Sequence, residues 1–109
     1  MKELQAKIVK TARDYGVRHN IVLDSDYIML KLQEELGELT QAYLIYRRKC
    51  RIQKYRLEAE AKAEVANELA DVAGFIFFLA EVLEIDLEAA LVSKWINKKQ
   101  ERPAPARNE

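Results

Sequence analysis

Two clusters of acidic residues carry the chemistry that this chain of 109 residues suggests. Glu35 and Glu38 are three residues apart in the first, and so are Glu68 and Asp71 in the second. In a helix this spacing puts both carboxylates of a cluster on one face, where like charges repel each other and lose hydration near a core. We therefore expect a cation between them. Oxygen donors with no neighbouring His or Cys suit Mg²⁺ or Mn²⁺ better than Zn²⁺.

Composition and charge favour a single cytoplasmic domain. Eighteen basic residues balance eighteen acidic ones, so the net charge gives no reason to expect binding to nucleic acid or to an acidic membrane. Cys50 is the only cysteine, which excludes an intramolecular disulfide and favours a reducing compartment. The first ten residues lack the apolar core of a signal peptide, and the longest apolar run is too short to span a bilayer.

The same sequence predicts an all-α fold, because its three glycines and two prolines leave long stretches of helix-forming residues. We expect four helices. The first covers residues 2–15. The second is capped by Asp24, Ser25 or Asp26 and continues to about Tyr46. The third covers residues 57–83, and the fourth is capped by Asp86 and runs to about Lys99.

The ends of these helices define the domain. Gly16 is expected to stop the first helix in a left-handed conformation, with residues 17–23 as a connection. Two prolines follow residue 102, so we expect a domain over residues 1–102 and a loose C-terminal tail over residues 103–109.

The two central helices are expected to form an antiparallel hairpin. The midpoint between the acidic clusters falls close to Gln53, and a turn there would place the clusters level with each other. All the carboxylates would then converge on one point. Gly37 lies inside the first cluster, and a glycine within a helix usually has a packing reason, so another helix or a ligand is expected to approach there.

Residues 72–80 would form a stretch of helix that is apolar on every side, so every side should be buried. A small four-helix chain covers such a helix with difficulty, so we expect part of it to form a subunit interface in a homodimer or homotetramer. The alternative is a central helix enclosed by the other three.

Taken together, the acidic motifs resemble the signature of the MazG-like all-α nucleoside triphosphate pyrophosphohydrolases. That signature is Glu-Glu-x-x-Glu followed, some thirty residues on, by Glu-x-x-Asp, and here it reads EELGE at residues 34–38 and ELAD at residues 68–71. The similarity covers about residues 24–103. It includes the segment 85–90 and, after it, Lys94, Asn97, Arg102 and Pro103.

This resemblance implies a four-helix-bundle-like fold with a central hairpin, in an oligomer. It also implies Mg²⁺-dependent hydrolysis of (deoxy)nucleoside triphosphates between the α- and β-phosphates, in nucleotide-pool house-cleaning, with Mn²⁺ as a possible substitute. The implied metal ligands are Glu35, Glu38, Glu68 and Asp71. Glu34 is the candidate for orienting or deprotonating the attacking water beside Glu35, although it could equally support the ligands from outside.

The resemblance assigns the phosphates or the sugar to Lys94, Asn97 and Arg102. The alternative is a solvated helix end, where basic residues are favoured by the helix dipole. The expected partners are the nucleotide and further copies of the chain, with no nucleic acid and no membrane.

Three other side chains could contact the base, and each has a structural alternative. His19 could contact the base or form hydrogen bonds within its loop. Trp95 could stack on the base or pack in the core, and Phe75 could flank the nucleotide or pack in a core or interface.

Several alternatives stay open from the sequence. The chain could be a phosphoribosyl-ATP pyrophosphohydrolase, or a non-catalytic metal-binding helical assembly module. The basic run from Arg47 to Arg56 could be a solvated hairpin tip, could contact phosphates across an oligomer interface, or could bind nucleic acid. A di-iron bundle is disfavoured because His19, the only histidine, lies outside both motifs.

Overall fold

The computed structural model describes residues 1–97, and every regular element in that range is helical. The all-α prediction is therefore confirmed for this part of the chain. The elements are α1 (Lys2–Arg18), α2 (Ser25–Tyr46), the 3₁₀ turn η1 (Ile52–Lys54), α3 (Glu58–Val82), α4 (Leu87–Leu91) and the π-helical turn η2 (Val92–Ile96).

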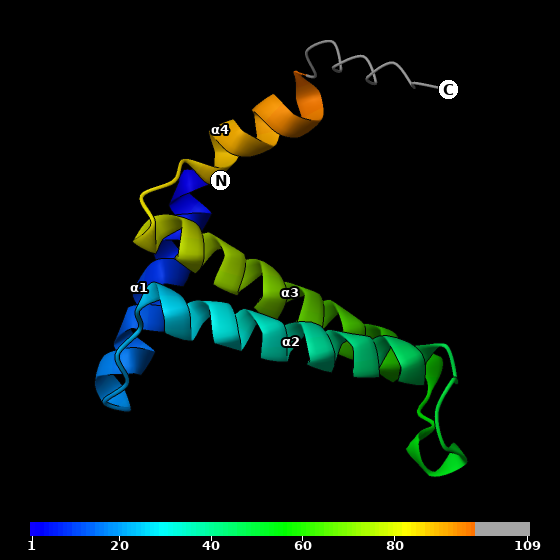
Figure 1. Ribbon diagram of the computed structural model, residues 1–109. Helices are drawn as coiled ribbons and strands as arrows, with labels where there is room; N and C mark the ends of the chain where they lie inside the picture. Colours follow the sequence, from blue (N-terminus) through cyan, green and yellow to red (C-terminus); the bar gives the residue numbers. More distant parts are fainter. Residues whose placement is uncertain (98–109) are drawn as a thin grey trace, which may run out of the picture.

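Helices α2 and α3 form the predicted antiparallel hairpin, which dominates the structure (Figure 1). The connection between them contains η1, which includes Gln53, so the expected position of the turn is confirmed. Arg48, just after α2, has a φ of 55° and redirects the chain out of the helix. We call residues 47–57 the hairpin tip.

The hydrophobic core lies at the end of the hairpin that is far from this tip. Val9 of α1, Ile28 of α2 and Phe78 of α3 are buried against one another there. Helix α1 crosses the hairpin at this end, packing mainly on α3, and leaves the half of the hairpin nearer the tip uncovered (Figure 1).

Side-chain caps begin two of the helices as the sequence predicts. The Asp24 carboxylate accepts a hydrogen bond of 2.8 Å from the backbone N–H of Tyr27 at the start of α2. Asp86 accepts one of 3.0 Å from Ala89 at the start of α4. Each cap satisfies a backbone donor that the helix itself leaves unpaired.

The expected end of the first helix at Gly16 is wrong, because α1 continues to Arg18 and Gly16 is a buried helical residue. The change of direction occurs at Asn20, which has a φ of 54°. Gly16 is required for close packing instead, since a Cβ atom there would lie 2.7 Å from Cδ1 of Leu23. The returning chain therefore lies directly against the end of α1.

The fourth helix is shorter than predicted within the described residues. Its α-helical part ends at Leu91, and η2 carries the chain to Ile96. The two elements project away from the hairpin (Figure 1), and none of their residues is buried. The predicted end of this helix at Lys99 and the predicted tail over residues 103–109 lie outside the described residues. Among residues 1–97, no helix is long and apolar enough to cross a membrane.

Candidate metal centre and adjoining pocket

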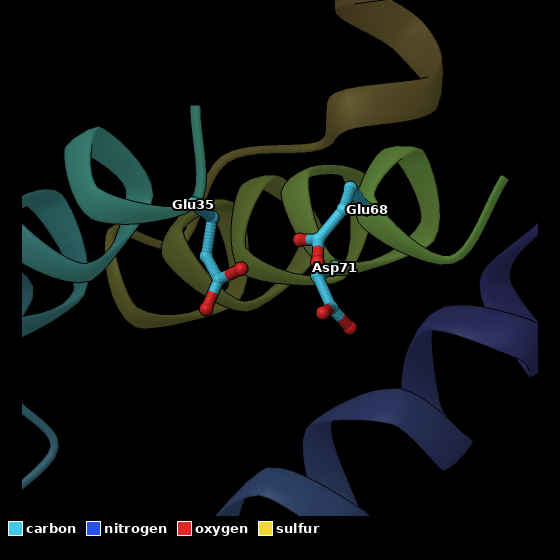
Figure 2. A group of neighbouring side chains, drawn as sticks. All are labelled: Glu35, Glu68 and Asp71. Carbon is cyan, nitrogen blue, oxygen red and sulfur yellow. The ribbon is translucent and has the colours of Figure 1, made fainter. Parts of the chain in front are cut away.

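Three of the four predicted carboxylates meet where α2 and α3 face each other. One carboxylate oxygen from each of Glu35, Glu68 and Asp71 lies within 4.8 Å of the others. Figure 2 shows Glu35 reaching across from α2 towards Glu68 and Asp71, which are one helical turn apart on α3. We call these three residues the carboxylate cluster.

The apolar pattern of α2 turns Glu35 inwards. Ile28 and Ala42 lie seven residues before and after it, on the same side of the helix, and all three residues are buried against α3. Only 8% of the surface of Glu35 is exposed, and no other charged or polar residue in the described part of the chain is buried to that degree. The packing of its neighbours therefore holds a carboxylate in a place where its charge is poorly hydrated.

Two oxygen atoms of the cluster lack a hydrogen-bond donor. Oε2 of Glu35 and Oε2 of Glu68 are both inaccessible to solvent and unpartnered. The pKa of Glu35 is raised to about 7, mainly by burial, and also by hydrogen bonding with Glu38 and by the charges of Glu38, Asp71 and Glu68. Burial also raises the pKa of Glu68, together with the charges of Glu38 and Asp71.

These features fit a hard divalent cation. Buried acceptors without donors are costly, and repulsion among close carboxylates adds to that cost. A cation between them removes both penalties, and a donor set made only of oxygen atoms suits Mg²⁺ or Mn²⁺. The residues present therefore fit the metal that the sequence predicts.

The remaining members of the first motif lie beside the cluster. Glu38 is one turn along α2 and affects the pKa of Glu35, but its oxygen atoms are not among those that converge. Glu34 is exposed and pairs with Lys31 at 3.0 Å. This hydrogen bond is the main reason that the pKa of Lys31 is raised.

A pocket of about 680 Å³ opens beside the cluster, between α1 and the hairpin. Its lining is mainly apolar, with aromatic rings, two lysines and two carboxylates of the cluster. The lining residues that concern a ligand are Lys7, Thr11, Tyr15, Tyr27, Lys31, Glu35, Asp71 and Phe75. Phe75 thus lies where the sequence places it, next to Asp71. The volume is in the range of small-molecule sites.

Sequence reasoning missed the two lysines of this pocket. The position of Lys31 could have been predicted, because it precedes Glu35 by four residues and therefore lies on the same side of the helix. Lys7 had no comparable signal, because the apolar side of α1, with Val9 and Ala12, does not by itself show that a lysine beside it borders a pocket. We therefore identify it only from the tertiary structure.

The structure does not bring the predicted downstream residues to the pocket. Lys94 and Asn97 are exposed at η2 and do not line it, and Arg102 lies outside the described residues. Trp95 is 71% exposed, so the core-packing interpretation is wrong for this chain. His19 caps the C-terminal end of α1, and its ring lies tilted against that of Tyr15, with the centroids 4.3 Å apart. Tyr15 lines the pocket, whereas His19 does not.

No helix of the described residues packs at Gly37, and the approach of a ligand there stays a prediction. A Cβ atom built on it meets nothing within 4 Å, because this position points away from both α3 and α1. Within residues 1–97, no element approaches the hairpin at Gly37.

Comparison with known proteins identified no relative: no family model, no curated protein and no solved structure matches the chain.

Proposed function

We propose that this protein is a Mg²⁺-dependent nucleoside triphosphate pyrophosphohydrolase, which forms a nucleoside monophosphate and pyrophosphate. The observation that supports it most is the carboxylate cluster, with two buried unpartnered oxygens, at the edge of a pocket of nucleotide size. The reaction class comes from the resemblance of the two acidic motifs to the MazG-like family.

Glu35, Glu68 and Asp71 would hold the ion, and Glu38 would complete the set from the next turn of α2. When bound, the ion supplies positive charge that offsets the triphosphate and polarises the phosphorus under attack. Without that charge, the cluster would repel a substrate that carries about four negative charges.

The pocket would hold the base and sugar. Phe75 of α3, Tyr27 of α2 and Tyr15 of α1 all line this pocket. Aromatic walls favour a flat heterocycle because stacking is worth roughly 1–3 kcal/mol per base. Lys31 lines the same pocket as Glu35, so its ammonium group suits a contact with the phosphates.

The attacking water must lose a proton, and a carboxylate of this chain would accept it. A water oxygen attacks the phosphorus, the bond to the bridging oxygen breaks, and pyrophosphate leaves with that electron pair. Glu34 adjoins Glu35 and is held by Lys31, so we assign it as the acceptor of the water's proton. The protein otherwise contributes position and charge.

The proposed setting is the cytoplasm, where the lone Cys50 stays reduced, and the proposed working form is a homodimer or homotetramer. Removal of unwanted (deoxy)nucleotides is the role that the resemblance implies.

The test is a panel of ribo- and deoxyribonucleoside triphosphates and phosphoribosyl-ATP, assayed for pyrophosphate with and without Mg²⁺. We expect pyrophosphate and monophosphate from at least one ordinary nucleotide, none without metal, and none from Glu35→Gln. A preference for phosphoribosyl-ATP would change the substrate. Metal binding with no product from any substrate would instead identify a non-catalytic module.

A further inference from the structure

The chain has no net charge, but its charges are unevenly distributed. No residue from position 39 to position 57 is acidic, and this stretch holds six of the eighteen basic residues, all in the hairpin tip. They are Arg47, Arg48, Lys49, Arg51, Lys54 and Arg56. The rest of the chain holds twelve basic and eighteen acidic residues. An anionic partner is therefore attracted by the tip and repelled, on balance, by the remainder.

The basic side chains of the tip are exposed and carry unneutralised charge. Within residues 1–97 none of them forms an ion pair, since the ion pairs there involve lysines of α1 and α2 only. The guanidinium group of Arg47 lies 6.0 Å from the ring centroid of Tyr43, and that of Arg48 lies 5.0 Å from the centroid of Tyr55. A tyrosine ring orients a guanidinium group and leaves its charge in place. The tip thus offers a concentrated positive charge to a partner.

Two apolar side chains of the tip are also exposed to solvent. Ile52, at the start of η1, is 75% exposed, and Leu57, directly before α3, is 71% exposed. Each follows an arginine in the sequence. Apolar side chains among cations suit the surface of an anionic membrane, where they enter the boundary of the acyl chains while the cations contact lipid phosphates.

The position of the tip favours a flat partner. Figure 1 shows it at the free end of the hairpin, away from α1 and α4, so a surface can meet it end-on. A nucleic acid longer than the tip would run along the start of α3, which carries Glu58, Glu60 and Glu64. Those acids repel phosphates, and Ile52 and Leu57 add nothing to a contact with a phosphate backbone. A membrane is therefore favoured over a nucleic acid.

We propose that the hairpin tip docks end-on on an anionic membrane surface, without crossing it. Its arginines and lysines contact lipid phosphates, while Ile52 and Leu57 enter the boundary of the acyl chains. Glu35 is eleven residues before the end of α2, about 17 Å from the membrane at 1.5 Å per residue, so the pocket stays open to solution. The sequence expectation of no membrane partner rests on net charge alone and does not consider this separation. The docking surface does not depend on the proposed hydrolase activity.

Flotation with lipid vesicles tests the proposal on the unsubstituted protein. It should rise with vesicles that contain phosphatidylserine and phosphatidylcholine and stay behind with vesicles of phosphatidylcholine alone, and added salt should release it. Equal binding to both kinds of vesicle, or no binding to the anionic ones at physiological ionic strength, would overturn the proposal.

Charge reversal tests whether the tip is the surface that binds. Arg51→Glu with Lys54→Glu should weaken binding to the anionic vesicles about a hundredfold or more. The matched control, Lys10→Glu with Lys62→Glu, changes the net charge equally at exposed positions on α1 and α3 and should leave binding nearly unchanged. An equal loss in both variants would mean attraction by net charge, and the tip would not be the docking surface.

Two further substitutions separate binding from folding. Arg48 has a φ of 55°, which glycine adopts more easily, and Leu57 is the N-cap of α3, where serine is preferred. Arg48→Gly and Leu57→Ser should therefore keep or increase stability in urea melts. Each should nevertheless weaken binding to the vesicles, by roughly five- to tenfold. Full binding by both variants would contradict the proposed contact.

Cys50 reports the environment of the tip directly, because it is the only thiol and lies within the tip. An environment-sensitive fluorophore on Cys50 should shift to shorter wavelength with the anionic vesicles and show no shift with the neutral ones. An unchanged spectrum in vesicle-bound protein would exclude the tip from the contact. Fluorescence anisotropy with single- and double-stranded oligonucleotides provides the comparison. Tight binding to an oligonucleotide together with no binding to vesicles would identify a nucleic-acid surface and overturn the proposal.

Discussion

Glu35 on α2 and Glu68 on α3 each hold one carboxylate oxygen away from water without a hydrogen-bond donor, and the two side chains converge to within 4.8 Å. Two acids 33 residues apart in the chain thus share a poorly hydrated site. A folded protein tolerates this arrangement at a cost in stability, which a bound cation removes.

Glu35→Gln is expected to abolish turnover and to stabilise the metal-free protein. The substitution removes a buried charge and its repulsion with Glu68 and Asp71, so the gain at pH 8 should be on the order of 1–3 kcal/mol. Urea melts in the presence of a chelator measure it. The control is Glu60→Gln, at an exposed position on α3, which should change the free energy of unfolding by about 0.5 kcal/mol or less. A clear loss of stability in Glu35→Gln would mean that the acid is structural.

The metal-free protein should lose stability as the pH rises towards and through neutrality. The pKa of Glu35 is about 7 in the folded chain and 4.5 in the unfolded chain, so between these values the folded state binds more protons. Glu35 therefore makes its full favourable contribution to the free energy of unfolding below pH 4.5. That contribution, on the order of 3 kcal/mol, is lost as the pH rises through 7. Melts from pH 5 to 8.5 should show this slope, and Glu35→Gln should flatten it.

Magnesium should reverse this loss. A ligand at about 100 times its Kd stabilises the folded state by about 2.7 kcal/mol, and the effect here should grow with pH because the ion needs ionised carboxylates. Thermal melts with and without Mg²⁺ test this for the unsubstituted protein and for Asp71→Asn, which should not respond. An equal response of Asp71→Asn would place the ion elsewhere.

Lys31→Ala is expected to weaken nucleotide binding while leaving Mg²⁺ binding by the free enzyme nearly unchanged. A charge-assisted contact with phosphate is worth roughly 1.5–3 kcal/mol, so kcat/KM should fall about ten- to a hundredfold. Lys10→Ala is the matched control, since Lys10 pairs with Asp14 on α1 and does not line the pocket. Comparison with Lys94→Ala by titration calorimetry with a non-hydrolysable nucleotide decides which lysine contacts the phosphates.

Two glycine substitutions should have opposite effects on stability. Gly37→Ala adds a Cβ atom where nothing lies within 4 Å, so it should stabilise α2 by about 0.5–1 kcal/mol. Gly16→Ala places a Cβ atom 2.7 Å from Leu23 and 3.2 Å from the carbonyl oxygen of Ile21, so it should cost about 1–3 kcal/mol. If urea melts show a gain for both variants, Leu23 does not pack against α1 as described.

The sequence by itself determined the features that depend on neighbouring residues. The helical class and the caps at Asp24 and Asp86 follow from local propensity. The turn near Gln53 follows from the spacing of the two acidic clusters, once they are taken to lie level in a hairpin. The same is true of the pairing of carboxylates on each helix, since residues three apart always share a face.

Only the tertiary structure decided which of these features meet. It brought Glu35 to Glu68 and Asp71 and left Glu38 beside them, and it placed α1 across the hairpin so that side chains of three helices line one pocket. It also kept Gly16 inside a helix, because the constraint there is the approach of Leu23 and not the local conformation. Such contacts join residues that are distant in the chain, so they depend on how whole helices pack and not on the preferences of any one segment.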